Sequence, residues 1–211
     1  MSITGTATME RTRGSAAVVM IDAADVHPGW WPCALDGIDR DPQLLDWLLS
    51  GRRTRARLFG SLVDATGLSP RPAPSGSTLG RLIALDEKAF GRVLCRIGLV
   101  WNRALLAREI DHSTLHRIIG QVGEESLRRA LSEGAPAGRI PADGETGGID
   151  PDMLAADGNF CLRHWIAAHT ARGADQLCLR LPPLAARRPR LSVDEAARAR
   201  HIVDCEVMAD G

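Results

Sequence analysis

The sequence predicts a mainly α protein, an irregular multi-helix single domain with a proline- and tryptophan-rich N-terminal loop and at most one short extended segment. Apolar residues recur at steps of three and four over most of the chain, which is the spacing of amphipathic helices. The chain has 211 residues, of which 45% are hydrophobic and 25% charged, so it can bury one sizeable core without a metal or disulfide. We therefore expect a flexible tail at residues 1–16, a helical domain at residues 17–211, and a flexible loop at residues 134–150 within that domain.

The N-terminal region combines a tail, an apolar stretch and an unusual loop. Residues 1–15 are rich in Ser, Thr and Gly and show no periodicity, whereas residues 17–21 are apolar and predict either a short strand or an apolar anchor. The segment His27-Pro28-Gly29-Trp30-Trp31-Pro32 predicts a loop without regular structure, because its prolines lack amide donors and its glycine favours a turn. Two indoles within such a loop normally hold it in place.

Two helices are predicted after this loop. Asp41 can cap the first, with Pro42 at its first helical position, and Gly51 ends it. The second, at residues 52–66, carries its apolar residues on one stripe, formed by Leu58, Phe59, Leu62 and Val63. Its first turns hold four arginines whose charge opposes the helix dipole, namely Arg52, Arg53, Arg55 and Arg57. Such a cluster is typical of a solvated face or of a surface that meets an acidic partner, and the sequence leaves both open.

The middle of the chain contains the clearest helical signal. Residues 69–77 hold three prolines and a glycine and predict a loop, which a short turn at Thr78 follows. A long helix begins after Asp86 and extends to about Arg108, with a stripe formed by Phe90, Val93, Leu94, Ile97, Trp101 and Leu105. Ser113 is expected to cap a helix that ends at Gly123, and residues 124–133 form another. Residues 134–150 are rich in glycine and give the one internal boundary.

The C-terminal part predicts two helices and one extended piece. Asp150 and Pro151 start a helix that Gly158 is expected to interrupt or kink. The alternating residues Leu177, Leu179 and Leu181 predict a short extended segment ended by two prolines. Ser192 and Glu195 form the sequence signature of a capping box, which starts a final helix through residues 202–203.

Composition excludes several classes of protein. The 26 basic and 26 acidic groups give zero net charge, which argues against a protein that binds nucleic acid by neutralising phosphates. No apolar stretch is long enough for a signal peptide core or a membrane span, so we expect a cytoplasmic protein without direct membrane insertion. The five cysteines are irregularly spaced, without a metal-binding pattern, and are interpreted as reduced, mostly buried thiols.

Residues 109–116 offer the best enzymatic alternative. They contain Glu109, Asp111, His112 and His116, and two histidines four residues apart on a helix can share a metal, as in an HD-like metal-dependent phosphohydrolase. A helix capped by Ser113 would leave His112 outside it, and the order Asp-His is the reverse of the metal-binding pair. His164 and His169 would not converge on a straight helix. We therefore predict no catalytic residues, no metal and no cofactor.

The segment 27–32 resembles the H-P-x-W-x-P element of the SctK (YscK) family of type III secretion proteins. Residues 81–93, 122–127 and 179–182 are similar to further parts of that family, so the resemblance covers residues 25–183 in patches. Trp31 is bulkier than the aliphatic residue usual in the family, and residues 134–150 resemble a lineage-specific insertion.

The resemblance implies a helical accessory subunit of the injectisome sorting platform, without catalytic activity, at the cytoplasmic face of the inner membrane. Its partners would be the cytoplasmic domain of the inner-membrane ring protein SctD and the SctQ pod protein, which in turn holds SctL and the ATPase SctN. Exposed tryptophans often anchor interfaces, so the partner-binding candidates are His27, Pro28, Trp30, Trp31 and Pro32. The alternative is that the indoles only attach the loop to the core.

Overall fold

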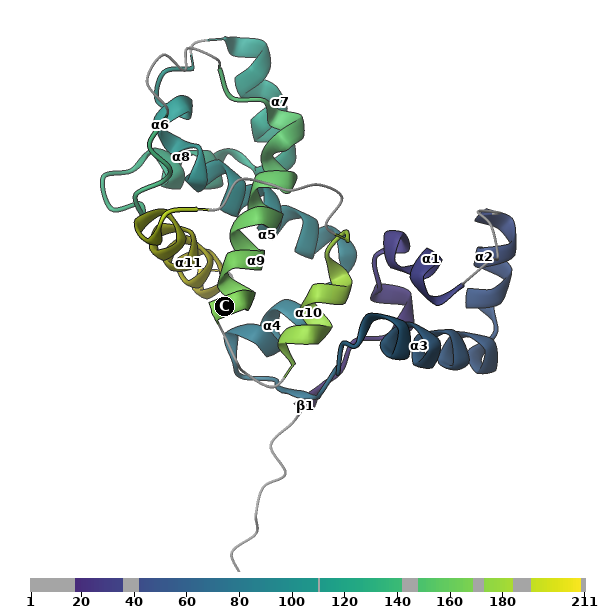
Figure 1. The fold of residues 1–211 in the computed structure, drawn as a ribbon. Helices are drawn as coiled ribbons and strands as arrows, with labels where there is room; N and C mark the ends of the chain where they lie inside the picture. Colours follow the sequence, from purple (N-terminus) through teal and green to yellow (C-terminus); the bar gives the residue numbers. More distant parts are fainter. Residues whose placement is uncertain are drawn as a thin grey trace, which may run out of the picture.

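The computed structural model describes residues 18–35, 42–109, 111–141, 148–168, 173–183 and 191–209. Over these ranges the protein is mainly α-helical and irregular, as the sequence predicts (Figure 1). The predicted tail at residues 1–16 and the predicted cap Asp41 lie outside the described residues. In chain order the elements are β1 (Val18–Val19), η1 (Ala23–Asp25), η2 (Pro28–Trp30), α1 (Trp31–Ala34), α2 (Pro42–Ser50), α3 (Arg52–Thr66), β2 (Ala73–Pro74), α4 (Thr78–Ala84), α5 (Glu87–Trp101), α6 (Arg103–Leu106), α7 (His112–Val122), α8 (Glu124–Leu131), η3 (Pro151–Met153), α9 (Leu154–Ala168), α10 (Ala174–Arg180) and α11 (Val193–Met208).

The centre of the molecule is the packed pair α5 and α9 (Figure 1). Two glycines let these helices approach closely: a Cβ on Gly158 of α9 would lie 1.8 Å from the carbonyl oxygen of Leu94, and one on Gly98 of α5 would lie 2.0 Å from that of Leu154. Gly158 therefore lies inside a continuous helix, and the predicted interruption there was wrong. Gly158 is required for another reason: its lack of a side chain lets α9 cross α5 at short distance.

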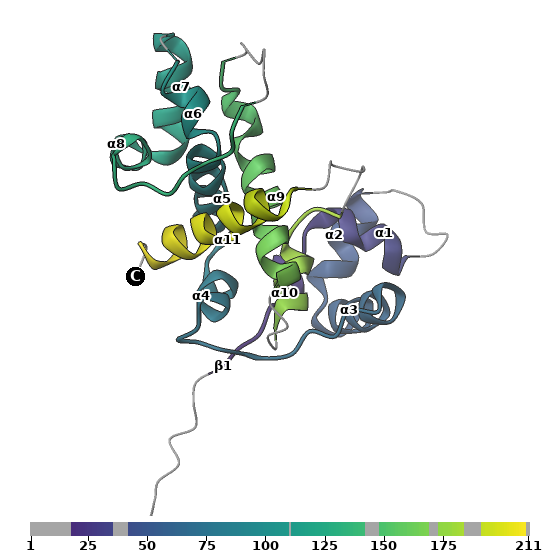
Figure 2. The same ribbon diagram turned by 60° about the vertical axis from the view of Figure 1, so that its left-hand side comes forward.

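Helix α11 lies across this pair and also contacts α4 (Figure 2). Its start is the predicted capping box, in which Ser192 and Glu195 each accept from the other's backbone N–H. A buried charge cluster lies near its end, where the carboxylate of Glu206, 3% exposed, lies 2.7 Å from Arg129 and 3.3 Å from Arg96. These ion pairs join α11 to α8 and α5.

The N-terminal helices α1, α2 and α3 pack on one another and lie to one side of the α5–α9 pair (Figures 1 and 2). Helix α3 has the predicted bounds and ends at Gly67 in the left-handed conformation, at φ +66°. Val18–Val19, within the apolar stretch, form β1, which pairs antiparallel with β2. The predicted loop at residues 69–77 therefore contains one short strand.

Four other local predictions were wrong. The segment 27–32 is regular after all, because each proline stands in the first turn of η2 or α1, where no backbone donor is needed. Residues 78–84 form a helix rather than a turn. The long helix from Asp86 breaks at buried Asn102, after which α6 begins. The three alternating leucines lie in and directly after α10, a helix none of whose residues is fully exposed.

The glycine-rich region 134–150 has no helix or strand at its described residues 134–141 and 148–150, and residues 142–147 lie outside the described part. Residues 135–139 contact the end of α5 and the start of α6: Arg103 donates to the carbonyl of Ala135 at 2.6 Å, and Arg139 N–H donates to that of Trp101 at 2.8 Å. All five cysteines are free thiols, but only Cys161 is buried and Cys33 is exposed, so the expectation of mostly buried thiols was wrong.

Candidate partner-binding surfaces

The segment 27–32 is attached to the C-terminal end of α10. The indole N–H of Trp30 donates to the carbonyl of Leu181 at 2.7 Å, and the backbone N–H of His27 donates to that of Leu179 at 2.9 Å. Gly29 allows this approach, because a Cβ there would lie 2.8 Å from Cδ of Pro183. The segment thus joins the N-terminal helices to the rest of the molecule.

The two indoles have different environments. Trp31 is 1% exposed and packs in the core, so its side chain does not face a partner in this conformation. Trp30 and His27 are half-buried, whereas Pro28 and Pro32 are exposed. The partner-binding role of the segment stays a prediction, and the surface that it offers consists of the two prolines and the outer edges of His27 and Trp30.

His27 is held in its neutral form. Its ring nitrogen Nδ1 accepts from the backbone N–H of Gly29 at 3.0 Å, which caps η2. Burial lowers the pKa of His27 below its ordinary value of 6.5, and the positive charge of Arg163 lowers that pKa further. A neutral imidazole in this place keeps the cap intact at neutral pH.

A second exposed surface lies on α2 and α3, and we call it the Trp47 surface. It consists of Leu44 and Trp47 on α2, which are 37% and 67% exposed, and of the exposed arginines Arg52, Arg53 and Arg57 at the start of α3. Trp47 points away from α3 because Leu45 and Leu49, on the opposite side of α2, pack against the core. The helical positions of Leu45 and Leu49 place them about 200° around the α2 axis from Trp47.

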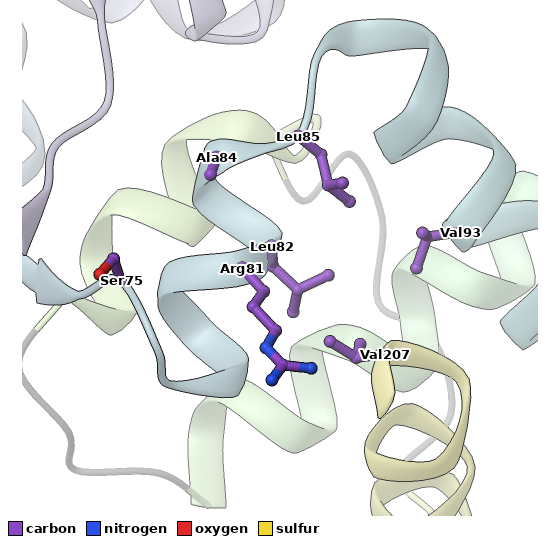
Figure 3. Close-up of a pocket in the computed structure, with 7 residues that line it drawn as sticks. All are labelled: Ser75, Arg81, Leu82, Ala84, Leu85, Val93 and Val207. Atoms are coloured by element: carbon purple, nitrogen blue, oxygen red, sulfur yellow. The ribbon is translucent and has the colours of Figure 1, made fainter. Parts of the chain in front are cut away.

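A third feature is a cavity of about 440 Å³ between α4, α5 and α11, which we call the Arg81 pocket (Figure 3). Leu82, Val93 and Val207 are buried and form its floor, and the Arg81 side chain extends beneath Leu82 toward Val207. This site was not predicted because the sequence indicated only a short turn at Thr78, and a turn has no face that could line a pocket.

Residues 109–116 do not form a metal centre in the described part of the chain. Asp111, and not Ser113, caps α7 by accepting from the N–H of Thr114 at 2.8 Å. The hydrogen bond that Asp111 accepts from the Ser113 hydroxyl, together with that from Thr114 N–H, lowers the pKa of its carboxyl group. His112 therefore lies inside α7, one turn before His116, and both are exposed. No group of three metal-ligating side chains occurs among the described residues. His164 is half-buried beside Phe160, and His169 lies outside the described residues.

A comparison with known protein families shows to which family the chain belongs. The family model described as YOP proteins translocation protein K (YscK) matches residues 20–206. The chain belongs to the YscK family. The match extends over the segment 27–32, the Trp47 surface and almost all of the helical core.

Membership makes this YscK family protein a type III secretion protein, with partners within the secretion apparatus. The family is a component of that apparatus and is not known as an enzyme. Searches of curated proteins and of solved structures found no match. None of the helices in the described ranges is long and apolar enough to span a bilayer.

Proposed function

We propose that the protein is a non-enzymatic adaptor of the type III secretion sorting platform that links the cytoplasmic domain of an SctD-like ring protein to an SctQ-like pod protein. The observation that carries the proposal is the YscK family match over residues 20–206. In this role the protein lies in the cytoplasm, against the inner-membrane part of the apparatus. It contacts SctL and the ATPase SctN only indirectly, through the pod protein.

The distribution of candidate surfaces supports an adaptor. An adaptor must contact two partners at once, so it needs two surfaces that do not overlap. The Trp47 surface lies on α2 and α3, whereas the Arg81 pocket lies between α4, α5 and α11, and α10 lies between the two regions in both views (Figures 1 and 2). Exposed Trp and Arg side chains are the residues that most often dominate binding energy at protein interfaces.

The test is reconstitution with purified proteins of the same secretion system. The full chain is mixed with the SctD-like cytoplasmic domain and with the SctQ-like protein, separately and together, and the complexes are measured by size-exclusion chromatography with light scattering. An adaptor gives both binary complexes and a ternary complex that does not form without it. Binding of neither protein at micromolar concentration would refute the proposal.

A metal titration separates the adaptor from the phosphohydrolase alternative. We expect isothermal titration with Zn²⁺ and Mn²⁺ to show no stoichiometric site at His112 and His116, because the described chain brings no third ligand to them. Tight one-to-one binding that is lost in His112→Ala would contradict this expectation and would favour the enzymatic alternative.

A further inference from the structure

The Arg81 pocket has the layout of an interface hot spot. Its floor is apolar and buried, formed by Leu82, Val93 and Val207, whereas Ser75 and Ala84 on its rim are exposed. The walls come from α4, α5 and α11, and α11 contacts both of the other helices (Figure 3). A volume of about 440 Å³ falls within the usual range of binding pockets.

Arg81 is the one charged residue among those that line the pocket in the described part of the chain. It is half-buried, and no carboxylate of the described residues pairs with it. Neighbouring arginines have partners within the protein. Arg96 and Arg129 contact Glu206, and Arg180 donates to the carbonyls of Leu82 and Ile83 near the end of α4. Among the described residues, the guanidinium of Arg81 therefore lies beside an apolar cavity without an ion-pair partner.

We propose that the Arg81 pocket is a docking site for an acidic amphipathic segment of a partner protein. One large apolar side chain of that segment fills the cavity, and an Asp or Glu next to it pairs with Arg81. The inference rests on the proposed adaptor function and specifies one of its contacts. Charge complementarity sets the class of partner, because a cation at the rim of an apolar cavity favours a carboxylate attached to an apolar group and disfavours a basic segment.

The exposure of the rim favours a protein segment over a small molecule. A small ligand is normally enclosed over most of its surface, whereas two of the residues that line this cavity, Ser75 and Ala84, are exposed to solvent. A segment that protrudes from a partner fits such an opening. A small anionic amphiphile and a second copy of the chain are the competing occupants, and the experiment separates them.

Affinities for the purified SctD-like domain and the SctQ-like protein are measured by isothermal titration with four variants of the full chain. Arg81→Glu reverses the charge, Arg81→Lys retains it, and Ala84→Phe fills the opening from an exposed position that has no role in the core. Arg108→Glu is the matched control, because Arg108 is exposed directly after α6 and does not line the pocket. Circular dichroism and thermal unfolding verify that each variant is folded.

For one of the two partners we expect Arg81→Glu and Ala84→Phe each to weaken binding about tenfold or more, since a charge-assisted contact in a desolvated pocket has roughly that effect. Arg81→Lys retains most of the affinity, and Arg108→Glu leaves it unchanged. Higher salt weakens the wild-type complex more than the Arg81→Glu complex.

Three results would overturn the inference. Affinities of Arg81→Glu and Ala84→Phe within twofold of the wild type for both partners would show that the pocket is not used, while the adaptor function would stand. Saturable binding of decanoate that does not compete with either partner would assign the pocket to an amphiphile, and concentration-dependent dimerisation lost in Arg81→Glu would assign it to a second copy. Failure of the wild type to bind either partner would instead refute the proposed function.

Discussion

Replacing Gly158 by alanine tests whether the close approach of α5 and α9 determines the stability of the fold. The new Cβ would lie 1.8 Å from the carbonyl oxygen of Leu94 and 2.9 Å from its Cα. Both atoms belong to the backbone, so no side chain can rotate away to make room. The two central helices would have to move apart at the point where they contact each other most closely.

Two opposing contributions decide the size of the effect. Alanine is better than glycine in a helix interior by about 1 kcal/mol. Overpacking of a core costs about 1–3 kcal/mol and occasionally more, and a clash with backbone belongs at the upper end of that range. We therefore expect Gly158→Ala to lower the free energy of unfolding by about 2 kcal/mol or more, which corresponds to roughly 4–8 °C in Tm for a chain of this size.

Gly91→Ala is the matched control, because Gly91 lies in the middle of α5 and a Cβ there meets nothing within 4 Å. This variant should be more stable than the wild type by up to about 1 kcal/mol. Both proteins are unfolded in urea and followed by far-UV circular dichroism. If Gly158→Ala is as stable as Gly91→Ala, the reasoning about the α5–α9 contact is refuted.

Three further perturbations test other parts of the structure. Trp31→Ala should lower the free energy of unfolding by about 3–5 kcal/mol in urea denaturation, because the indole is in the core. An unchanged free energy of unfolding would contradict this core role and favour a role of Trp31 in partner binding. Glu206→Ala should cost about 3 kcal/mol by leaving Arg96 and Arg129 without their carboxylate, and Glu206→Gln should cost less; equal stability of all three proteins would contradict a structural role for these ion pairs. The lowered pKa of His27 means that the folded state favours the neutral ring. The stability due to His27 is therefore complete above about pH 6.5 and decreases as the pH falls. We expect Tm between pH 8 and 5 to depend less on pH in His27→Gln than in the wild type.

The sequence predicted those helices whose ends carry caps and whose apolar residues form one stripe. Helix α3 has the predicted bounds, and α11 begins at the predicted capping box of Ser192 and Glu195. In these helices the capping residues and the apolar stripe favour the same structure that packing in the folded protein requires. The end of α5 and the start of α7 were predicted wrongly, because Asn102 ends α5, with its side chain donating to the carbonyl of Gly98, and Asp111 rather than Ser113 caps α7.

Helix α10 could not be predicted from periodicity, because none of its residues is fully exposed and its buried residues include polar ones. Gln176 and Arg180 are buried together with the leucines. Both polar side chains form hydrogen bonds with residues distant in sequence: Gln176 accepts from Ile21 N–H, and Arg180 donates to the carbonyl of Leu82 at 2.8 Å. A helix whose buried face carries polar side chains shows only a weak amphipathic stripe. The Arg81 pocket was missed for a related reason, since it exists only where three helices from distant parts of the sequence meet.

The contacts of α10 also bear on how an adaptor could hold two partners. This short helix accepts hydrogen bonds from the backbone of Ser69 through Asp175 and from that of Ile21 through Gln176, and the carbonyls at its C-terminal end accept from His27 and Trp30. Hydrogen bonds are directional, so these contacts fix the orientation of the N-terminal helices as well as their attachment. The Trp47 surface lies on one side of α10 and the Arg81 pocket on the other, and α10 therefore sets the distance and angle between them. If both surfaces bind, the geometry of the assembled platform depends on these few backbone contacts as much as on the interfaces themselves.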